Sequence, residues 1–374
     1  MAKQSLVPNP AKIKVIGAGG GGCNSITRMV REDIKGVEFI AMNTDAQALA
    51  LVEAPVRFQL GEKLTKGLGC GGDHHVGQKA AEENRDELRE LLSGADMVFV
   101  TCGMGGGTGT GSIPVIAEIA KKCGALTIGI VTKPFSFEGS RRMRTAEEGI
   151  VGLLTKVDTL IIIPNDRLLS LCDQKTGVEN AFRLADSVLY NGVKAISEVI
   201  TLPGIINLDF ADVRAIMKDA GPAWMSIGIG SGKDRAVNAA KEALASPLLE
   251  VSIKGARGVL LNVVGGESLT LQEVNEAAQV VRDTVSQDAN IIFGVVHDSS
   301  MANDVKITLI ATGFTQMGAS DTESMEQDKI LRALKTEDEL DVPSFMRHPM
   351  FSHRRQIPNS TQVETGSPVK IRTP

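Results

Sequence analysis

Two glycine-rich runs, each directly after a short apolar segment, constrain this chain more than any other feature. The first run, Gly17–Gly22, follows the segment Lys12–Ile16, and the second, Gly103–Gly111, follows Met97–Thr101. After each run the sequence has helical character. A strand, a glycine loop and a helix in this order are typical of a parallel sheet covered by helices. We therefore expect an α/β fold whose first domain has a Rossmann-like parallel sheet.

The remaining pattern indicates a second α/β unit. Apolar residues recur at spacings of three and four over Val178–Ile200, weakened only locally by Gly192. This predicts one long central helix of about 33 Å. Other helices are expected at 24–32, 112–122, 207–218, 234–245 and 271–285. Other strands are expected at 38–42, 126–132, 159–164, 225–229, 258–264, 291–297 and 305–312. The long helix thus joins the first domain to a smaller α/β domain with a mixed sheet.

Composition sets the expected boundaries of the remaining segments. After Phe314 the chain is polar and acidic, which favours a flexible linker. The expected divisions are a disordered N-terminus at 1–10, a first domain at 11–177, the central helix at 178–200, a second domain at 201–314, a linker at 315–339, a partner-binding peptide at 340–348 and a disordered basic tail at 349–374.

Charge and cysteine content narrow the class of protein. The chain has 374 residues with 40 basic and 45 acidic side chains, a formal net charge of −5. This balance offers no basic face, so no nucleic-acid partner is expected. Five cysteines without a C-x-x-C pair favour a reducing cytosol. No secretory signal and no apolar run long enough to span a membrane are found in the sequence.

The glycine runs have the chemistry of a phosphate site. Free N–H groups at a helix N-terminus and the helix dipole favour anions, and glycine lets the main chain approach a phosphate closely. Thr108 and Thr110 add hydroxyl donors to the second run. No G-x-x-x-x-G-K-[ST] motif is present, so a P-loop is excluded. We therefore expect a nucleoside triphosphate held from both sides by two lysine-free loops.

An alternative rests on the first run alone. Gly17, Gly19 and Gly22 match the G-x-G-x-x-G pattern of dinucleotide-binding enzymes, and Asp45 follows at about the spacing of the acidic residue that binds ribose in those enzymes. A dinucleotide-dependent oxidoreductase would leave the second run unexplained. The sequence also offers no convincing catalytic constellation around a His or Tyr.

The second run carries a resemblance to a known family. Residues 105–111 read GGGTGTG, which resembles the signature of the tubulin/FtsZ family. Further motifs at 17–24, 43–49, 134–142 and 207–212 are similar to those of the FtsZ branch and occur in the expected order. The resemblance covers roughly Ala11–Phe314 and favours FtsZ-type proteins over tubulins, whose chains are longer.

The resemblance implies a cytosolic GTPase that polymerises head to tail into protofilaments. It further implies that the filaments form the contractile division ring at midcell, on the inner face of the membrane at the future septum. The first domain would bind GTP or GDP, and the second would activate hydrolysis. Mg²⁺ is expected with the phosphates, although no protein ligand can be assigned. A GTP-binding scaffold that neither hydrolyses GTP nor polymerises is a second alternative.

The resemblance also implies roles for individual residues. In the first run, phosphate contacts are expected from Gly20, Gly21, Gly22, Cys23 and Asn24. In the second run they are expected from Gly106, Gly107, Thr108, Gly109 and Thr110. Glu138 and Arg142 would hold the ribose and phosphate side, and Asn165, Phe182 and Asp186 the guanine. Asp209 and Asp212, together with Asn207, would enter the nucleotide site of the next subunit and orient the attacking water.

The chemistry of the side chains agrees with these roles. The carboxylate of Asp186 can accept hydrogen bonds from both N1–H and the exocyclic amine of guanine, a pair that adenine lacks. Phe182 lies four residues earlier on the same helix face, where its ring can cover the base. From the residues alone, core packing of Phe182 and a solvated Asp186 stay open. Helix capping by Asp209 and Asp212 stays open too.

The C-terminal region contains one recognisable peptide. Leu340–Arg347 resembles the C-terminal peptide of the family, which implies docking of its apolar anchors into membrane-tethering and regulatory division proteins. A random apolar patch is the alternative. The basic residues that follow, including Arg354 and Arg355, depart from the family pattern. A solvated tail and contact with acidic lipid are both compatible with them.

Two further departures concern the loops. Gly69–His75 contains Cys70, His74 and His75, where the family usually has Asn-Pro-Glu after the glycines. In the family this loop senses the terminal phosphate. Exposed histidines and a metal site are both compatible with the sequence. Cys23 in the first run suggests the hypothesis that thiol oxidation weakens nucleotide binding.

Overall fold

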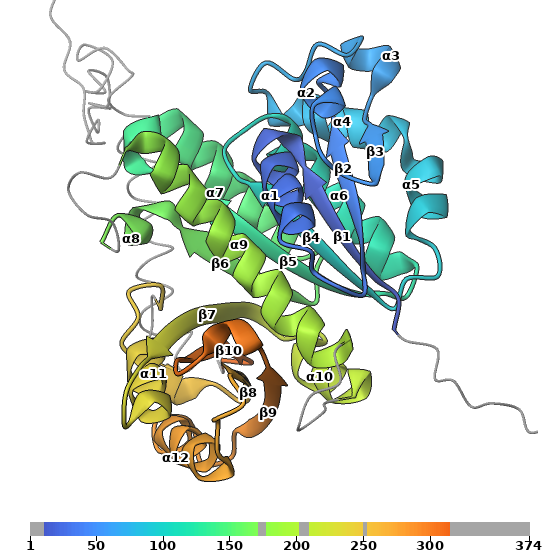
Figure 1. Cartoon of the computed structure of the whole chain (residues 1–374). Helices are drawn as coiled ribbons and strands as arrows, with labels where there is room; N and C mark the ends of the chain where they lie inside the picture. Colours follow the sequence, from blue (N-terminus) through green and yellow to red (C-terminus); the bar gives the residue numbers. More distant parts are fainter. Residues whose placement is uncertain (1–10, 171–176, 202–208, 250–252, 315–374) are drawn as a thin grey trace, which may run out of the picture. The chain divides into compact units, whose positions relative to one another are not determined.

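One continuous sheet organises the part of the chain that the computed structural model describes, residues 11–170, 177–201, 209–249 and 253–314 (Figure 1). Its strand order is β3-β2-β1-β4-β5-β6-β7-β10-β8-β9. The strands are β1 (Ile13–Ala18), β2 (Val37–Asn43), β3 (Val56–Gln59), β4 (Met97–Gly103), β5 (Leu126–Lys133), β6 (Thr159–Pro164), β7 (Gly221–Gly230), β8 (Gly258–Gly265), β9 (Asn290–His297) and β10 (Val305–Thr312). The pairs among β1 to β6 are all parallel, as the sequence pattern predicts.

Strand β7 belongs to both halves of the sheet. Residues Gly221–Ala223 pair in parallel with β6, whereas Trp224–Gly230 pair antiparallel with β10. β8 then pairs antiparallel with β10 and parallel with β9, so the second half is the expected mixed sheet. The sequence pattern predicts β7 only from Met225, and therefore misses the residues that make the sheet continuous.

Helices cover both faces of the parallel half. They are α1 (Gly19–Arg31), α2 (Ala46–Ala50), α3 (Glu62–Thr65), α4 (His74–Glu83), α5 (Arg85–Leu92), α6 (Thr108–Lys122), α7 (Ser140–Leu154), α8 (Asn165–Leu169), α9 (Val178–Thr201) and α10 (Phe210–Met217), with a 3-10 turn η1 at Ser136–Glu138. Side chains of α1, α9 and α10 share one core with the sheet, and side chains of α4 to α7 share the other. Val15 and Ile16 of β1 enter different cores, because neighbouring strand residues point to opposite faces.

The second half has its own core. Helices α11 (Arg235–Leu244) and α12 (Leu271–Arg282) pack on one face of the mixed sheet. Short 3-10 turns η2 (Ile253–Gly255) and η3 (Ser299–Met301) join the elements. The opposite face contributes Leu260, Ile292 and Ile310 to the core that contains α9. The central helix is therefore packed against both halves.

Helix α9 is the long central helix that the sequence pattern predicts over 178–200. It has 24 residues, a length of about 36 Å. At its far end the hydroxyl of Thr201 donates to the carbonyl of Lys35, 3.4 Å away and just before β2 begins. A Cβ on Gly192 would lie 3.1 Å from Met225 Sδ and 3.3 Å from Ile130 Cδ1. Gly192 thus marks close packing of α9 against the sheet, whereas the sequence suggests only a local weakness.

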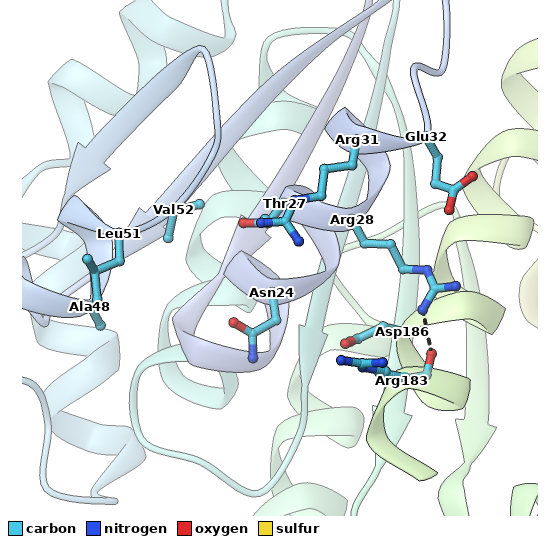
Figure 2. A pocket seen from close by; sticks show the side chains of 10 residues that line it. All are labelled: Asn24, Thr27, Arg28, Arg31, Glu32, Ala48, Leu51, Val52, Arg183 and Asp186. Atoms are coloured by element: carbon cyan, nitrogen blue, oxygen red, sulfur yellow. Dashed lines mark hydrogen bonds between the residues drawn. The ribbon is translucent and has the colours of Figure 1, made fainter. Parts of the chain in front are cut away.

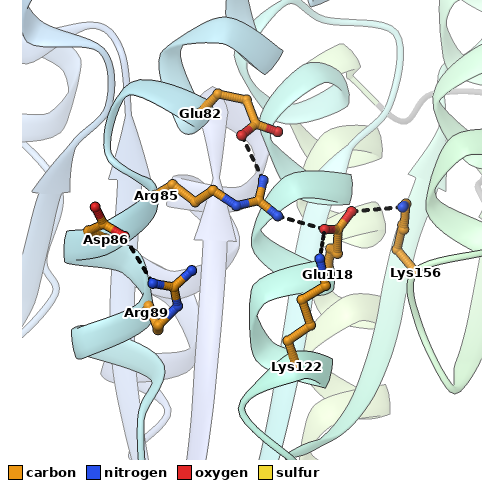
Figure 3. A network of polar contacts seen from close by, with 7 residues as sticks. All are labelled: Glu82, Arg85, Asp86, Arg89, Glu118, Lys122 and Lys156. Atoms are coloured by element: carbon orange, nitrogen blue, oxygen red, sulfur yellow. Dashed lines mark hydrogen bonds and ion pairs between the residues drawn. The ribbon is translucent and has the colours of Figure 1, made fainter.

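A polar network joins the helices on the α6 face (Figure 3). The carboxylate of Glu118 on α6 contacts Arg85 of α5 at 2.6 Å, Lys156 after α7 at 2.7 Å, and Lys122 on its own helix. Arg85 also pairs with Glu82 of α4 at 2.6 Å. The network lowers the pKa of Glu118 to about 2, chiefly through the hydrogen bonds from Lys122 and Lys156. One carboxylate therefore ties α4, α5 and the end of α7 to α6.

Both glycine-rich runs begin their helices earlier than the sequence suggests. The predicted helices at Asn24 and Ser112 in fact begin at Gly19 and Thr108. Low helix propensity is overridden here by tertiary packing, because only glycine fits the close contacts described below. Within the described residues, none of the helices is both long and apolar enough to cross a membrane.

Candidate functional site

The N-termini of α1 and α6 lie against each other where β1 and β4 end. A Cβ built on Gly19 would lie 2.7 Å from the main-chain nitrogen of Gly109, and one on Gly21 would lie 3.2 Å from that of Gly103. No side chain caps either helix. Two helix termini with free N–H groups therefore meet at the same sheet edge, an arrangement that attracts anions.

Most of the glycines in the two runs are explained by packing within the protein. A Cβ built on Gly17 would lie 2.3 Å from the carbonyl oxygen of Gly22, and one built on Gly22 would lie 2.7 Å from the carbonyl oxygen of Thr101. A Cβ built on Gly107 would lie 2.7 Å from Cβ of Cys70. Gly20 and Gly106 differ, because a Cβ there would meet nothing within 4 Å. These two positions leave main chain open to a ligand.

The rest of the second run is shaped by Gly105 and Thr110. Gly105 has a φ of +94°, and a Cβ there would lie 2.6 Å from the carbonyl of Arg142. The hydroxyl of Thr110 is buried and accepts a hydrogen bond from the Gly105 N–H at 2.9 Å. The hydroxyl of Thr110 thus holds the loop together from inside, and the expectation that it also donates to a phosphate stays a prediction.

Thr108 lies in a small polar contact between three segments. Its Oγ1 is 2.6 Å from Oγ1 of Thr44, which follows β2, and 3.4 Å from Sγ of Cys70. Thr44 and Cys70 are 3.3 Å apart. Thr44 belongs to the motif at 43–49 but was not among the residues expected at the nucleotide site. Through Cys70, this contact connects the second glycine run to Gly69–His75, the segment whose sequence departs from the family pattern.

The segment around His74 is helical rather than a loop. His74 and His75 form the first turn of α4, which Asp73 caps by accepting a hydrogen bond from His75 N–H at 2.8 Å. His74 Nε2 lies 3.6 Å from a carboxylate oxygen of Glu148. Among the described residues, no group of three or more His, Cys, Asp or Glu is arranged to hold a metal ion. The metal hypothesis for this segment finds no support.

Cys23 points into the core. It is buried, its Sγ is 3.5 Å from the carbonyl of Met42, and burial raises the pKa of its thiol to about 12. A buried, protonated thiol is neither nucleophilic nor readily oxidised. Burial of the thiol therefore disfavours the oxidation hypothesis, and we expect only the main chain of Cys23 to contact a phosphate.

A cavity of about 140 Å³ adjoins the glycine runs. The lining comes from both runs, η1, α7, α8 and α9: Gly21, Asn24, Gly103, Met104, Thr132, Pro134, Glu138, Arg142, Asn165, Phe182, Ala185, Asp186 and Leu189. Seven residues expected at the nucleotide site thus line one cavity: Gly21, Asn24, Glu138, Arg142, Asn165, Phe182 and Asp186.

The three residues expected at guanine differ in environment. Phe182 is 40% exposed and meets the buried ring of Phe135 edge-on, so it is not a core residue. Asn165 is buried, and its Oδ1 has no hydrogen-bond partner among the described residues. A buried amide oxygen without a partner is costly, which suits a position that a ligand donor completes. Glu138 and Arg142, which also line the cavity, pair at 3.1 Å.

Asp186 is half-buried and held by α1. Ser25 Oγ donates to its Oδ1 at 2.9 Å. Burial raises the pKa of Asp186, and the bond from Ser25 and the charge of Arg28 oppose this rise. A neighbouring hollow has a volume of about 730 Å³. Arg28, Arg183 and Asp186 are among the residues that line it (Figure 2). Asp186 is therefore not a solvated helix residue, and Ser25 and Arg28 are contacts that the sequence did not identify.

Asp45 does not fit the role of a ribose-binding acid. It caps α2 by accepting a hydrogen bond from Ala48 N–H at 2.9 Å. The dinucleotide alternative also requires the first glycine run to act alone, whereas that run is packed against the second. Both observations disfavour the oxidoreductase.

Asp209 and Asp212 lie outside this site. Asp209 caps α10 and accepts a hydrogen bond from Asp212 N–H at 2.8 Å, as the capping alternative anticipated. Just after α10, Asp219 pairs at 2.8 Å with Lys121, at the opposite end of α6 from the glycine run. The α10 region thus packs at the amino edge of the parallel strands, whereas the cavity lies at their carboxyl edge. Asn207 and Leu340–Arg347 lie outside the described residues.

Comparisons with known proteins agree with this architecture. A model of the tubulin/FtsZ family GTPase domain matches residues 12–173, and one of the FtsZ family C-terminal domain matches residues 221–315. The structure of an empty FtsZ dimer from M. jannaschii is 46% identical in sequence, over 83% of this chain and 90% of that chain, with a TM-score of 0.80.

Two more distant structures share the fold. CetZ1 of Haloferax volcanii, a GDP-bound monomer, is 21% identical over 82% of this chain and 96% of its own, with a TM-score of 0.70. CetZ2 of the same organism, a GTPγS-bound protofilament, is 19% identical over 88% of this chain and 100% of its own, with a TM-score of 0.72.

Proposed function

The chain belongs to the FtsZ family of tubulin-like GTPases, and from this membership we propose that it binds GTP where α1, α6 and α9 meet and hydrolyses it on head-to-tail assembly. The phosphates would lie over the open main chain at Gly20 and Gly106. Guanine would enter the cavity beside Asn165, Phe182 and Asp186. This arrangement needs no lysine, because two helix N-termini supply the positive field.

The observation that carries the proposal is the separation of the two candidate half-sites. The glycine run begins α6, and Lys121 near the end of that helix bonds Asp219, next to α10. The helix has 15 residues, a length of about 22 Å. A head-to-tail contact places one edge of a subunit on the opposite edge of the next. Such a contact would bring Asp209 and Asp212 of one subunit to the phosphates of its neighbour.

In the assembled site, the two aspartates would orient and polarise the attacking water, while the glycine runs stabilise the charge of the transferred phosphoryl group. Asn207 would act with them from the same segment. Because Asp209 caps α10, its carboxylate is anchored at the start of that helix. Hydrolysis would then depend on assembly, since neither half of the site suffices alone.

Mg²⁺ would accompany the triphosphate. The carboxylates of Asp45 and Asp73, in the segments beside the glycine runs, each cap a helix. The described residues therefore present no ready carboxylate set for the ion, and we derive no step from it. Phosphate oxygens and water would be its main ligands.

In the cell, we propose that the filaments build the division ring at midcell, on the cytoplasmic face of the membrane. The peptide Leu340–Arg347 would recruit membrane-tethering and regulatory division proteins. These roles rest on family membership and on the sequence of the peptide.

Mixing two inactive variants tests the shared site directly. Asp212→Asn should still bind GTP but lose hydrolysis by about 100-fold or more. Asp186→Ala should lose GTP binding while keeping its own Asp212. In a mixture, an Asp212→Asn subunit can receive the acidic loop of an Asp186→Ala neighbour, so activity should return to at most about a quarter of the wild-type rate for random pairing.

Two outcomes would overturn the proposal. Failure of every mixing ratio to restore activity, under conditions where light scattering shows co-assembly, would exclude a site shared in trans. A GTP turnover per subunit that stays constant on dilution to monomer would exclude dependence on assembly. GTP binding without turnover or light scattering in the wild type would instead favour the scaffold alternative.

A further inference from the structure

The hydroxyl of Ser25 touches both the phosphate side and the base side of the proposed nucleotide site. Ser25 is fully buried on α1, one turn after Gly21. Its Oγ is 2.9 Å from Oδ1 of Asp186 and 3.1 Å from the main-chain oxygen of Gly21. We propose that Ser25 is a positioning residue for guanine recognition, which holds the Asp186 carboxylate ionised and oriented toward the base. This inference rests on the proposed function.

The single proton of Ser25 has two possible acceptors. A serine inside a helix commonly donates to the carbonyl four residues earlier, which is Gly21 here. A carboxylate is the stronger acceptor, because a hydrogen bond to an ionised group is roughly twice as strong as one between neutral groups. An ionised Asp186 therefore takes the proton. The other carboxylate oxygen of Asp186, Oδ2, accepts no hydrogen bond from the described residues and remains available for the ligand.

Asp186 needs this support because it is half-buried beside the cavity. Burial raises the pKa of Asp186, whereas the hydrogen bond from Ser25 and the positive charge of Arg28 lower it. Protonation would replace an acceptor by a donor, and guanine offers two adjacent donors to this carboxylate. Guanine affinity should therefore follow the ionisation of Asp186, and Ser25 should extend that ionisation to lower pH.

The other charged groups near Asp186 are already engaged. Arg28 donates to the carbonyl of Arg183 at 3.0 Å, as Figure 2 shows. Arg183 pairs with Glu179 at 2.8 Å, and Arg31 pairs with Glu53 at 2.7 Å. Across the cavity, Glu138 and Arg142 pair with each other. Ser25 is thus the direct hydrogen-bond donor to Asp186 within the described residues.

The position of Ser25 also connects the two halves of the site mechanically. α1 carries Gly20 and Gly21 at its N-terminus and Ser25 one turn later, while Asp186 belongs to α9. A movement of α9 relative to α1 would break the Ser25–Asp186 bond. The bond therefore fixes the base carboxylate relative to the phosphate-binding main chain, as a bound nucleotide of fixed length requires.

The test measures GDP affinity of the full-length protein by calorimetry at pH 7.5 and pH 6.0 for wild type and Ser25→Ala. GDP avoids assembly during the titration. We expect Ser25→Ala to weaken GDP binding by about tenfold at the higher pH. The ratio of the dissociation constant at the lower pH to that at the higher pH should be larger in the variant. Titration of the phosphate affects both proteins equally and cancels in this comparison.

Ser187→Ala is the matched control, because Ser187 adjoins Asp186 but donates to the carbonyl of Leu184 at 2.7 Å. Ser25→Cys, which keeps the volume with a weaker donor, replaces Ser25→Ala if that variant does not fold. Asp186→Ala tests the proposed function itself. If it leaves GDP affinity unchanged, the proposed base site is wrong.

If Asp186→Ala weakens binding but Ser25→Ala behaves like Ser187→Ala, the inference about Ser25 is overturned and the proposed function stands. A loss in Ser25→Ala that is equal at both pH values also overturns it, because a packing defect does not titrate with Asp186. A tenfold loss with the larger pH ratio supports it.

Discussion

Gly19 of α1 and Gly109 of α6 meet main chain to main chain, since a Cβ on Gly19 would lie 2.7 Å from the Gly109 nitrogen. Gly19 also has a φ of +70°, which side-chain-bearing residues rarely adopt. This contact fixes two helix N-termini at one point. At the nearby Gly20 and Gly106, in contrast, an added Cβ would meet no other protein atom within 4 Å.

We expect Gly20→Ala and Gly106→Ala to fold normally and to lose nucleotide affinity. Neither Cβ meets protein atoms, so the Tm without nucleotide should stay within about 2 °C of wild type. GDP affinity should fall at least about tenfold, because the methyl group occupies space needed by a phosphate. Thermal melts and a fluorescent-GDP titration measure the two effects. Gly19→Ala, in contrast, should lower the Tm by several degrees, and equal melting of all three variants would contradict this division.

Replacing Asn165 should affect nucleotide binding more than the stability of the nucleotide-free protein. Its buried Oδ1 lacks a partner in the described residues, which costs roughly 1–3 kcal/mol in the absence of a ligand donor. Asn165→Ala removes that cost and opens a small cavity, so the Tm of the nucleotide-free protein should change little. The increase in Tm on adding saturating GDP should shrink markedly. Asn262→Ala is the control, because Asn262 also has an unpartnered buried Oδ1 but bonds α9 away from the cavity.

Among the described cysteines, the partly exposed Cys123 should react first with an alkylating reagent. Cys123 is partly exposed, whereas Cys23 and Cys102 are buried and have thiols whose pKa burial raises to about 12. Brief treatment of the folded protein with iodoacetamide at about pH 8 should label Cys123 before the buried Cys23, Cys70 and Cys102. Peptide mass spectrometry locates the label, and GDP affinity should be unchanged. Rapid labelling of Cys23 together with loss of binding would restore the oxidation hypothesis.

Most of the expected fold was correct because apolar strand segments and helical segments alternate clearly along the sequence. The parallel half, the mixed sheet and the long α9 all follow from apolar periodicity. Short elements such as β3 and α8 have too few residues to show a period, and they were missed. The longer helices α4, α5 and α7 were also not predicted. The early start of α1 at Gly19 was missed for another reason, since four consecutive glycines read as a loop unless their tertiary contacts are known.

The candidate site was predictable where the chemistry is local to a motif. The glycine runs and the spacing of Phe182 and Asp186 could be recognised along the chain, and these residues do line one region. Contacts between distant segments could not be recognised. Ser25 meets Asp186, 161 positions later in the sequence, and Thr44 meets Thr108, 64 positions later. Nothing in either sequence neighbourhood identifies the partner, because the pairing depends on how α1, α6 and α9 pack.

Glu118 should give the stability of the protein a specific pH dependence. Its folded pKa is held at about 2, below the ordinary value of 4.5, so its contribution is complete above about pH 4.5 and is lost as pH falls toward 2. Glu118→Gln should lower the free energy of unfolding at pH 7 by about 1 kcal/mol, because Arg85, Lys122 and Lys156 then lose their shared anion. In urea titrations from pH 7 to pH 3, the difference in free energy of unfolding between Glu118→Gln and wild type should narrow as pH drops below about 4.5.

Asp86→Asn is the control. It removes an exposed pair with Arg89 and should change the free energy of unfolding by less than about 0.5 kcal/mol. A Glu118→Gln deficit that stays constant down to pH 3 would show that the network acts through packing rather than charge.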